Sequence, residues 1–294
     1  MEKIRGNSYY FNARTAIGAY KTDDQLILID AGNDDSSIKK AIKSFGDIHV
    51  STILNTHSHA DHCGGNAYIQ KQHNCNIYAP VLESAFIENP VLEPTYLYGA
   101  APLETLKNKF LYVKPSVVTH PILGDEPVII GDGLVFKPIL LAGHSPNQMG
   151  YLTDDGIAYL GDALVSEEIS EKHPLIFTFD VQEHLNSLER LKSLEAHGYV
   201  IAHGGYYENI QALIHSNHEA LIQIHHYILE ILKHGPCTID GLHAKLVTLY
   251  HLEEQLSQAF LNRSVIMAHL KYLVDQNALV LEFVRGRFIL KRIT

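Results

Sequence analysis

The 294-residue chain has 33 acidic and 23 basic side chains, a formal net charge of −10 with histidine neutral. This charge repels a polyanion on average, which argues against non-specific nucleic-acid binding but allows a local basic groove. The start has no apolar stretch long enough for a signal peptide and no later run approaches a membrane span, so we expect a cytoplasmic protein without a membrane partner.

The first half of the chain is strand-rich. Apolar and β-branched runs predict strands over residues 9–11, 15–20, 25–29 and 50–54, with a helix over 36–45. Three cysteines are an odd count without paired spacing, so a disulfide framework is not expected. At this length the chain can form one large core plus a small appended module.

A histidine-rich run follows the strand over 50–54 and carries His57, His59, Asp61 and His62. In extended backbone, positions 57, 59 and 61 point a similar way, while the last histidine can reach a second ion. Among 19 histidines a lone His-x-His is a common coincidence, but this tetrad is much harder to obtain by chance. Cys63, the next residue, is interpreted as a small filler and not as a ligand.

Three further polar residues stand alone, each beside a glycine and after an apolar run. They are His144, Asp162 and His203. A single such residue is usually a turn or capping residue, but three of them together with the tetrad indicate a site. Imidazole and carboxylate are the ligands that zinc prefers, and iron and manganese also suit them. We therefore expect two divalent cations, most readily Zn²⁺, held by these seven side chains.

With these seven residues the chain resembles the metallo-β-lactamase fold superfamily of hydrolases, over roughly residues 7–215. The resemblance implies an α/β fold, the four-layer αββα sandwich. It further implies that one ion takes His57, His59 and His144, the other takes Asp61, His62 and His203, and Asp162 bridges the two. One departure is that many relatives have His-Gly-Pro where this chain has His203, Gly204 and Gly205, which affects the loop and not the ligand.

Two ions roughly 3.5–4 Å apart lower the pKa of a bridging water towards neutrality. The expected reaction is attack of that metal-bridging hydroxide on a small acyl substrate such as a thioester, ester or lactone. Asp61 is the expected catalytic residue, which would steer the hydroxide and accept a proton. Alternatives are an endoribonuclease or phosphodiesterase, and a low-turnover binding or regulatory protein of the same fold. The glutathione-thioester branch is disfavoured, because glutamates and no basic cluster follow Asp162.

Residues 81–114 form an insertion between the metal run and His144, and this segment is expected to behave as a lid. Tyr96 and Tyr98 would give it an aromatic wall at the entrance of the substrate pocket. The alternative is that both tyrosines are ordinary core. Further along, Asp180 is a good N-cap for a helix that runs to about Ala196.

We divide the chain into a catalytic domain over 1–215 and a helical domain over 216–294. Expected helices span 207–232 and 263–276, Thr238 caps another between them, and residues 278–284 and 287–293 form a hairpin. This order resembles a winged helix, as found in a lactamase-like endoribonuclease branch. Between Pro236 and the end, seven basic and five acidic residues leave a net charge of only +2. A packing or homodimer role is therefore favoured over nucleic-acid binding.

Overall fold

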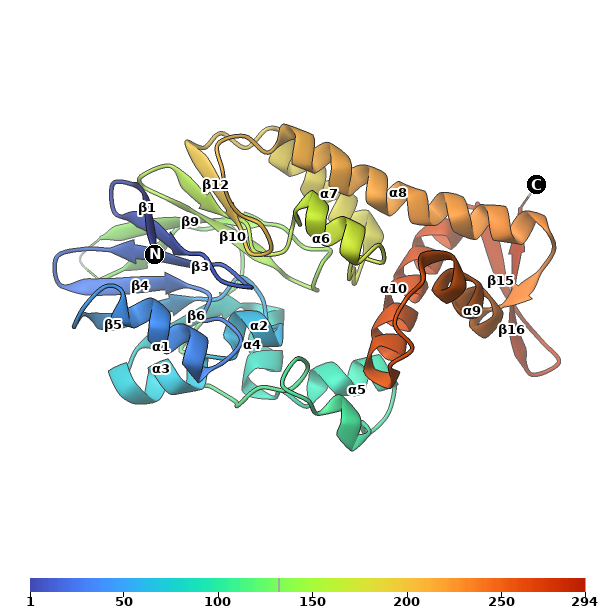
Figure 1. The fold of residues 1–294 in the computed structure, drawn as a ribbon, viewed down its shortest axis with the longest axis horizontal. Coiled ribbons are helices and arrows are strands. Elements are labelled where there is room, and N and C mark those ends of the chain that lie inside the picture. The colour runs from blue at the N-terminus through green and yellow to red at the C-terminus, as the bar shows by residue number, and fades with distance from the viewer. Residues whose placement is uncertain (132, 294) are drawn as a thin grey trace.

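Two β-sheets packed face to face, with helices on both outer sides, form the larger part of the protein (Figure 1). The computed structural model describes residues 1–131 and 133–293. The first sheet has the order β1 (Glu2–Arg5), β2 (Ser8–Phe11), β3 (Ile17–Lys21), β4 (Gln25–Ile29), β5 (His49–Leu54), β6 (Asn76–Pro80), β7 (His120–Ile122). The second sheet has the order β13 (Gly205–Tyr207), β12 (Gly198–Ile201), β11 (Ile157–Tyr159), β10 (Met149–Thr153), β9 (Leu134–Leu140), β8 (Val128–Ile130).

The helices cover the outer faces of the two sheets and continue into the C-terminal part. Those of the first half are α1 (Asp35–Lys43), α2 (Ala60–Cys63), α3 (Asn66–His73), α4 (Val81–Glu88), α5 (Leu92–Tyr98) and the short 3₁₀ helix η1 (Glu104–Leu106). Those of the second half are α6 (Glu167–Lys172), α7 (Val181–Lys192), α8 (Gln211–Lys233), α9 (Ile239–Tyr250) and α10 (Leu256–Asp275).

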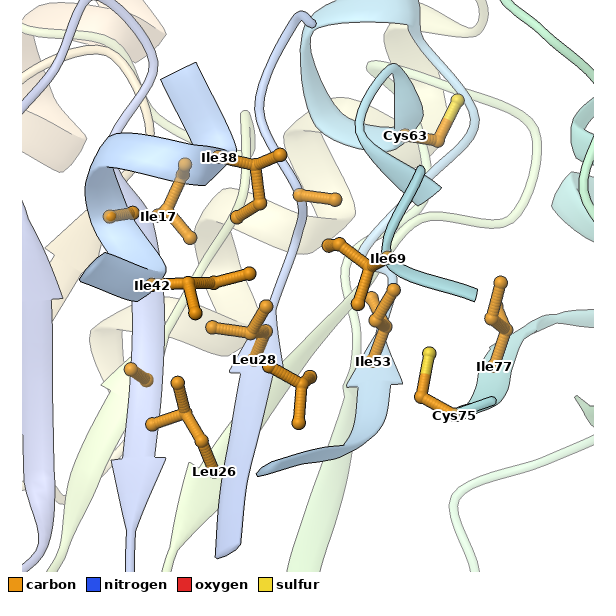
Figure 2. Close-up of a cluster of buried hydrophobic side chains, with 14 of the residues drawn as sticks. Ile17, Leu26, Leu28, Ile38, Ile42, Ile53, Cys63, Ile69, Cys75 and Ile77 are labelled. Atoms are coloured by element: carbon orange, nitrogen blue, oxygen red, sulfur yellow. The ribbon is translucent and has the colours of Figure 1, made fainter. Parts of the chain in front are cut away.

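Strand alternation divides the core into layers. In β4, Leu26 and Leu28 face the helices, whereas Ile27 and Ile29 face the second sheet, as expected for a strand buried on both sides. Figure 2 shows the helix-facing cluster, where Leu28 lies close to Ile42 of α1. A further cluster lies between the second sheet and helices α7 and α8. The expected four-layer α/β sandwich is therefore confirmed.

Cys63 belongs to the helix-facing cluster (Figure 2). Its Sγ donates to the carbonyl of Ser58 at 3.1 Å, and its side chain is 1% exposed. These contacts agree with its interpretation as a small filler.

The C-terminal part is mainly helical and ends in a small sheet. Its strands have the order β14 (Cys237–Thr238), β16 (Arg287–Arg292), β15 (Leu279–Val284). Figure 1 shows α8 running from the sandwich to this part, and α10 running back down to α5. The third helix begins at Leu256, earlier than the predicted residue 263, while the hairpin and the Thr238 cap are confirmed. The winged-helix assignment stays a prediction.

Two other predicted boundaries are wrong. Helix α8 starts at Gln211 and not at residue 207, because Tyr207 pairs with Tyr199 in the β12–β13 hairpin. Gly205 makes that hairpin possible with a φ of +82°, a conformation that a proline at this position could not adopt. Helix α7 is capped by Asp180 as predicted, but it ends at Lys192 and not at Ala196.

A substitution at Gly143 tests whether the loop before His144 needs the close approach of its backbone to α7. Its φ is +127°, and an added Cβ would come within 2.2 Å of the backbone nitrogen of His184. We expect Gly143→Ala to lower the free energy of unfolding by roughly 2–4 kcal/mol, measured by urea denaturation. Gly124→Ala is the control, because no atom lies within 4 Å of its added Cβ. Equal stability of the two variants would contradict this account.

Candidate metal centre

The seven predicted ligands meet at one edge of the sandwich, where strands from both sheets end. The histidine-rich loop follows β5, His144 follows β9, Asp162 follows β11 and His203 follows β12. Backbone bonds join the two sheets at this edge, since Met149 N donates to Thr56 O at 3.0 Å and Ala16 N to Ala202 O at 2.8 Å. Residues far apart in the sequence are thus held together by rigid strands.

The first group consists of His57, His59 and His144, whose ring nitrogens converge. Nδ1 of His59 lies 3.0 Å from Nε2 of His57 and 2.9 Å from Nε2 of His144. Burial holds the pKa of His57 well below its usual value and lowers that of His144 to about 3. These imidazoles are therefore neutral near pH 7, the form in which histidine binds a cation.

The second group consists of Asp61, His62 and His203. Oδ2 of Asp61 lies 3.2 Å from Nε2 of His203 and 3.8 Å from Nε2 of His62. The Asp162 carboxylate raises the pKa of His203 to about 10. Burial alone would lower the pKa of His62, but the surrounding carboxylates outweigh burial and raise it well above 6.5. Both histidines are thus protonated near pH 7 when no cation is present.

Asp162 lies between the two groups. Its carboxylate is 3.2 Å from His62, 3.2 Å from His203 and 3.5 Å from His144. Burial opposes ionisation of Asp162, but the neighbouring His203 and His62 hold its pKa well below the usual value. An ionised carboxylate that touches ligands of both groups can be shared between two cations.

Two buried atoms in the centre show that these residues fit a metal. Nε2 of His62 and Oδ1 of Asp162 are 3.2 Å apart and attract each other as opposite charges, yet neither makes a well-aligned hydrogen bond within residues 1–131 and 133–293. Buried polar atoms without partners are costly. Cation binding by both atoms would remove that cost, and imidazole and carboxylate are suitable donors for zinc.

Asp30 supports the centre from behind and was not predicted as a functional residue. Its buried carboxylate accepts hydrogen bonds from Thr56 N and Thr56 Oγ1, both at 2.8 Å, and lies 2.7 Å from Nδ1 of His62. The bond fixes the His62 tautomer, so that Nε2 is directed to the centre. One sequence signal could have pointed to it: Asp30 directly follows an apolar strand, as the histidine-rich run does. The structure shows that these two strands, β4 and β5, are parallel neighbours.

Glu83 is a second supporting carboxylate, and no sequence pattern pointed to it. This residue of α4 is fully buried and accepts bonds from the backbone and hydroxyl of Ser58 at 3.1 and 2.6 Å. It also accepts bonds from Ser145 Oγ and Asn147 N, both at 2.8 Å. Glu83 therefore ties the loop of His57 and His59 to the loop of His144.

A cavity of about 680 Å³ opens over the centre and is lined by five of the seven side chains: His59, Asp61, His144, Asp162 and His203. Its apolar lining comes from the insertion, the segment before α7 and α10: Phe110, Leu111, Leu175, Ile176, Phe177, Leu261 and Val265. The C-terminal part of the chain thus forms one wall of the cavity. A cavity of this size suits a small organic ligand.

Tyr96 and Tyr98 are not among the residues that line this cavity. Tyr96 packs edge-on against Phe86 and Phe179, and Tyr98 packs against Phe260 of α10. The structure thus favours the alternative that both tyrosines are packing residues, which join the insertion to the C-terminal helices. Aromatic character in the sequence could not distinguish this role from a pocket wall.

Comparison with known proteins identifies the family. The model of the metallo-beta-lactamase superfamily matches residues 12–203. The chain belongs to this superfamily. Metallo-beta-lactamase family protein TTHA1429 from Thermus thermophilus has the same fold, with a TM-score of 0.74, 19% identity and 98% and 99% of the two chains covered.

Curated relatives of this superfamily member are distant. The hydroxyacylglutathione hydrolase of Aliivibrio fischeri (strain ATCC 700601 / ES114) is 24% identical over 76% of this chain and 75% of its own length. The probable metallo-hydrolase YqgX of Bacillus subtilis (strain 168) is 24% identical over 80% of this chain and 87% of its own.

A third relative is matched over a shorter stretch. The hydroxyacylglutathione hydrolase of Thiobacillus denitrificans (strain ATCC 25259 / T1) is 25% identical over 139 residues. The aligned stretch covers 47% of this chain and only 41% of that protein. The family and these hydrolase names confirm the prediction of a metal-dependent hydrolase. The substrate stays a prediction.

Asp30 offers a test of the support behind His62. We expect Asp30→Asn to weaken zinc binding about 10–100-fold, because the amide no longer fixes the His62 tautomer. Titration with a chelating indicator measures the affinity. Asp154→Asn, at an exposed aspartate, is the matched control. Unchanged zinc affinity in a folded Asp30→Asn protein would show that the carboxylate is not needed for metal binding.

Proposed function

We propose that this chain hydrolyses a small acyl substrate, a thioester, ester or lactone, with two divalent cations held by the seven side chains. The observation that supports this best is the 680 Å³ apolar cavity directly over the donor atoms. Zinc is the first candidate metal, and iron and manganese suit the same ligands. Bound cations would make a water nucleophilic at neutral pH and polarise the acyl carbonyl.

The residues of the chain position this water and the substrate. Asp61 Oδ2 accepts a hydrogen bond from Thr15 Oγ1 at 2.8 Å, and its side chain is 31% exposed. Because its pKa is lowered below the usual range by His62 and His203, despite burial, Asp61 is ionised and can accept a hydrogen bond from water. Phe177 and Leu111 exclude bulk solvent from the acyl chain, which strengthens electrostatic interactions at the centre.

The phosphodiesterase alternative has less support. The lining contains Arg14 and Lys172, but the Arg14 guanidinium packs on the Phe110 ring at 5.6 Å. On α10, Arg263 pairs with Asp240 at 2.5 Å, and Lys271 pairs with Asp180 at 3.1 Å. Arg14, Arg263 and Lys271 are thus already engaged. Helix α10 also packs on α5, so this helix is not free to enter a nucleic-acid groove.

Cellular location and assembly stay as the sequence predicts them. Within the described residues, no helix combines the length and apolar character that a membrane crossing requires. We propose a cytoplasmic enzyme that acts on a small molecule, with homodimer formation through the C-terminal part as a further prediction.

A substrate screen tests the proposed function. We expect zinc-loaded protein to hydrolyse at least one acyl substrate from a panel of thioesters, alkyl esters and lactones. The kcat/KM for that substrate should exceed that for bis(4-nitrophenyl) phosphate by about 100-fold or more. A reversed preference would identify a phosphodiesterase, and no turnover of any substrate would favour a binding protein.

Asp162→Asn tests the shared carboxylate in the same assay. Turnover should fall by about 100-fold or more, with an unchanged circular dichroism spectrum, because the residue acts at the metal centre and not in the apolar core. Asp154→Asn should keep the wild-type rate. Wild-type turnover by a metal-replete Asp162→Asn protein would show that sharing is dispensable.

The pKa shifts predict a pH difference between the two groups. His57 and His144 are neutral near pH 7, whereas His62 and His203 carry protons that a cation must displace. The affinity of the second group should therefore rise with pH up to about 10, the pKa of His203, while that of the first stays nearly constant. Calorimetry in buffers of different ionisation enthalpy measures the protons released. If protons were released only when zinc binds to the group of His57, His59 and His144, the predicted difference would be contradicted.

A further inference from the structure

Glu93 is a buried carboxylic acid in the cavity wall with no role in the centre described above. It lies in the first turn of α5, is 7% exposed and lines the cavity over the donor atoms. No hydrogen bond or ion pair to its side chain is found in the described part of the chain, residues 1–131 and 133–293. Glu83, in contrast, is 0% exposed but accepts four hydrogen bonds.

Glu93 lies beside the histidine-rich loop. A narrow second pocket between α5 and this loop, with no room for a water molecule, is lined by Glu93 together with Ser58 and Ala60, which flank the predicted ligand His59. Leu111 borders both this pocket and the main cavity. Glu93 is therefore on the side of the cavity that adjoins the reacting centre, and not at its distant mouth.

The surroundings of Glu93 favour its neutral form. Burial is the largest cause that holds its pKa well above the usual value, and the carboxylates of Asp61 and Glu83 add to it. Glu93 in turn contributes to the raised pKa values of Tyr96 and Cys63, so both are neutral near pH 7 and neither forms an ion pair with it. Cations at the centre would offset the charge of Asp61 and would themselves favour the ionised form of Glu93, so its neutral form in the loaded protein rests on its burial.

Hydrolysis of an ester or lactone is accelerated by such an acid. As the acyl carbon–oxygen bond breaks, the departing alkoxide is a strong base and must take up a proton. As ligands, Asp61 and Asp162 would bind the cations as carboxylates, so neither would hold a proton for the leaving atom. A protonated carboxyl in the wall of the same cavity can supply that proton, as in other enzymes where an apolar site keeps an acid neutral.

We propose that Glu93 is a catalytic residue that protonates the leaving atom of the substrate. This inference rests on the proposed acyl hydrolase function. Water adds its oxygen to the acyl carbon and loses one proton to solvent. The bond to the leaving oxygen or sulfur then breaks, and that atom takes the Glu93 proton. Glu93 regains a proton from solvent, so that one water is consumed and an acid and an alcohol or thiol are released.

Two esters of one acyl group test the proposal, an ethyl ester and a 4-nitrophenyl ester. The nitrophenolate needs little protonation, whereas the ethoxide needs it fully. We expect Glu93→Gln to lower kcat for the ethyl ester about 100-fold or more, to lower kcat for the nitrophenyl ester by only a few-fold, and to keep a similar KM. Glu104→Gln, at an exposed glutamate of the same insertion, is the control. Elemental analysis verifies that both variants retain the metal.

A second readout does not depend on turnover. In zinc-loaded protein labelled with ¹³C at the glutamate side-chain carboxyl carbon, the resonance missing from Glu93→Gln should report a protonated carboxyl at pH 7. An ionised Glu93, or equal losses of kcat for both esters, would overturn the proposal and leave acyl hydrolysis intact. Wild-type protein that hydrolyses neither ester nor any other acyl substrate would instead defeat the proposed function, and this inference with it.

Discussion

The candidate metal centre depends most directly on the hydrogen bonds of the Asp30 carboxylate. Asp30 follows β4, and its carboxylate accepts two hydrogen bonds from Thr56 at the start of the histidine-rich loop and one from Nδ1 of His62. Asp30 itself has a φ of +63°, which is uncommon for a residue other than glycine. The cost of this conformation is offset by the hydrogen bonds, which tie the start of the histidine-rich loop and His62 to the end of β4.

The same edge of the sandwich brings together opposite electrostatic environments. Three neutral imidazoles form one group, while two protonated histidines share the other with ionised carboxylates. Without cations, those protons stabilise Asp61 and Asp162. Cation binding would therefore displace protons at one group only. This asymmetry arises from Asp162, which touches ligands of both groups but has a stronger influence on His62 and His203.

The insertion and the C-terminal helices convert an open metal centre into a cavity. Leu97, Leu106 and Leu111 pack with Phe260 and Leu261 of α10, and α10 faces the metal centre with Leu261 and Val265. Residues outside the matched range 12–203 thus form part of the cavity wall, and we expect them to contribute to substrate selection. Distant relatives that share the sandwich therefore do not have to share a substrate.

The sequence predicts the centre well, because its ligands follow apolar strands and parallel strand ends meet at one edge. His57, His144 and Asp162 are examples, and the structure brings them together as expected. Glu83 could not be predicted, because its partners at Ser58 and Ser145 lie on loops whose contact depends on the tertiary fold. Tyr96 illustrates the opposite difficulty, since an aromatic side chain has the same appearance in a sequence whether it packs or lines a pocket.

A crystal structure of the zinc-loaded protein, with anomalous diffraction at the zinc edge, tests the central claim most directly. We expect two anomalous peaks, one among His57, His59 and His144 and one among Asp61, His62 and His203. Asp162 should lie about 2.0–2.2 Å from zinc and contact both peaks. A single peak in fully loaded protein, or an Asp162 carboxylate that contacts neither, would contradict the shared two-cation centre.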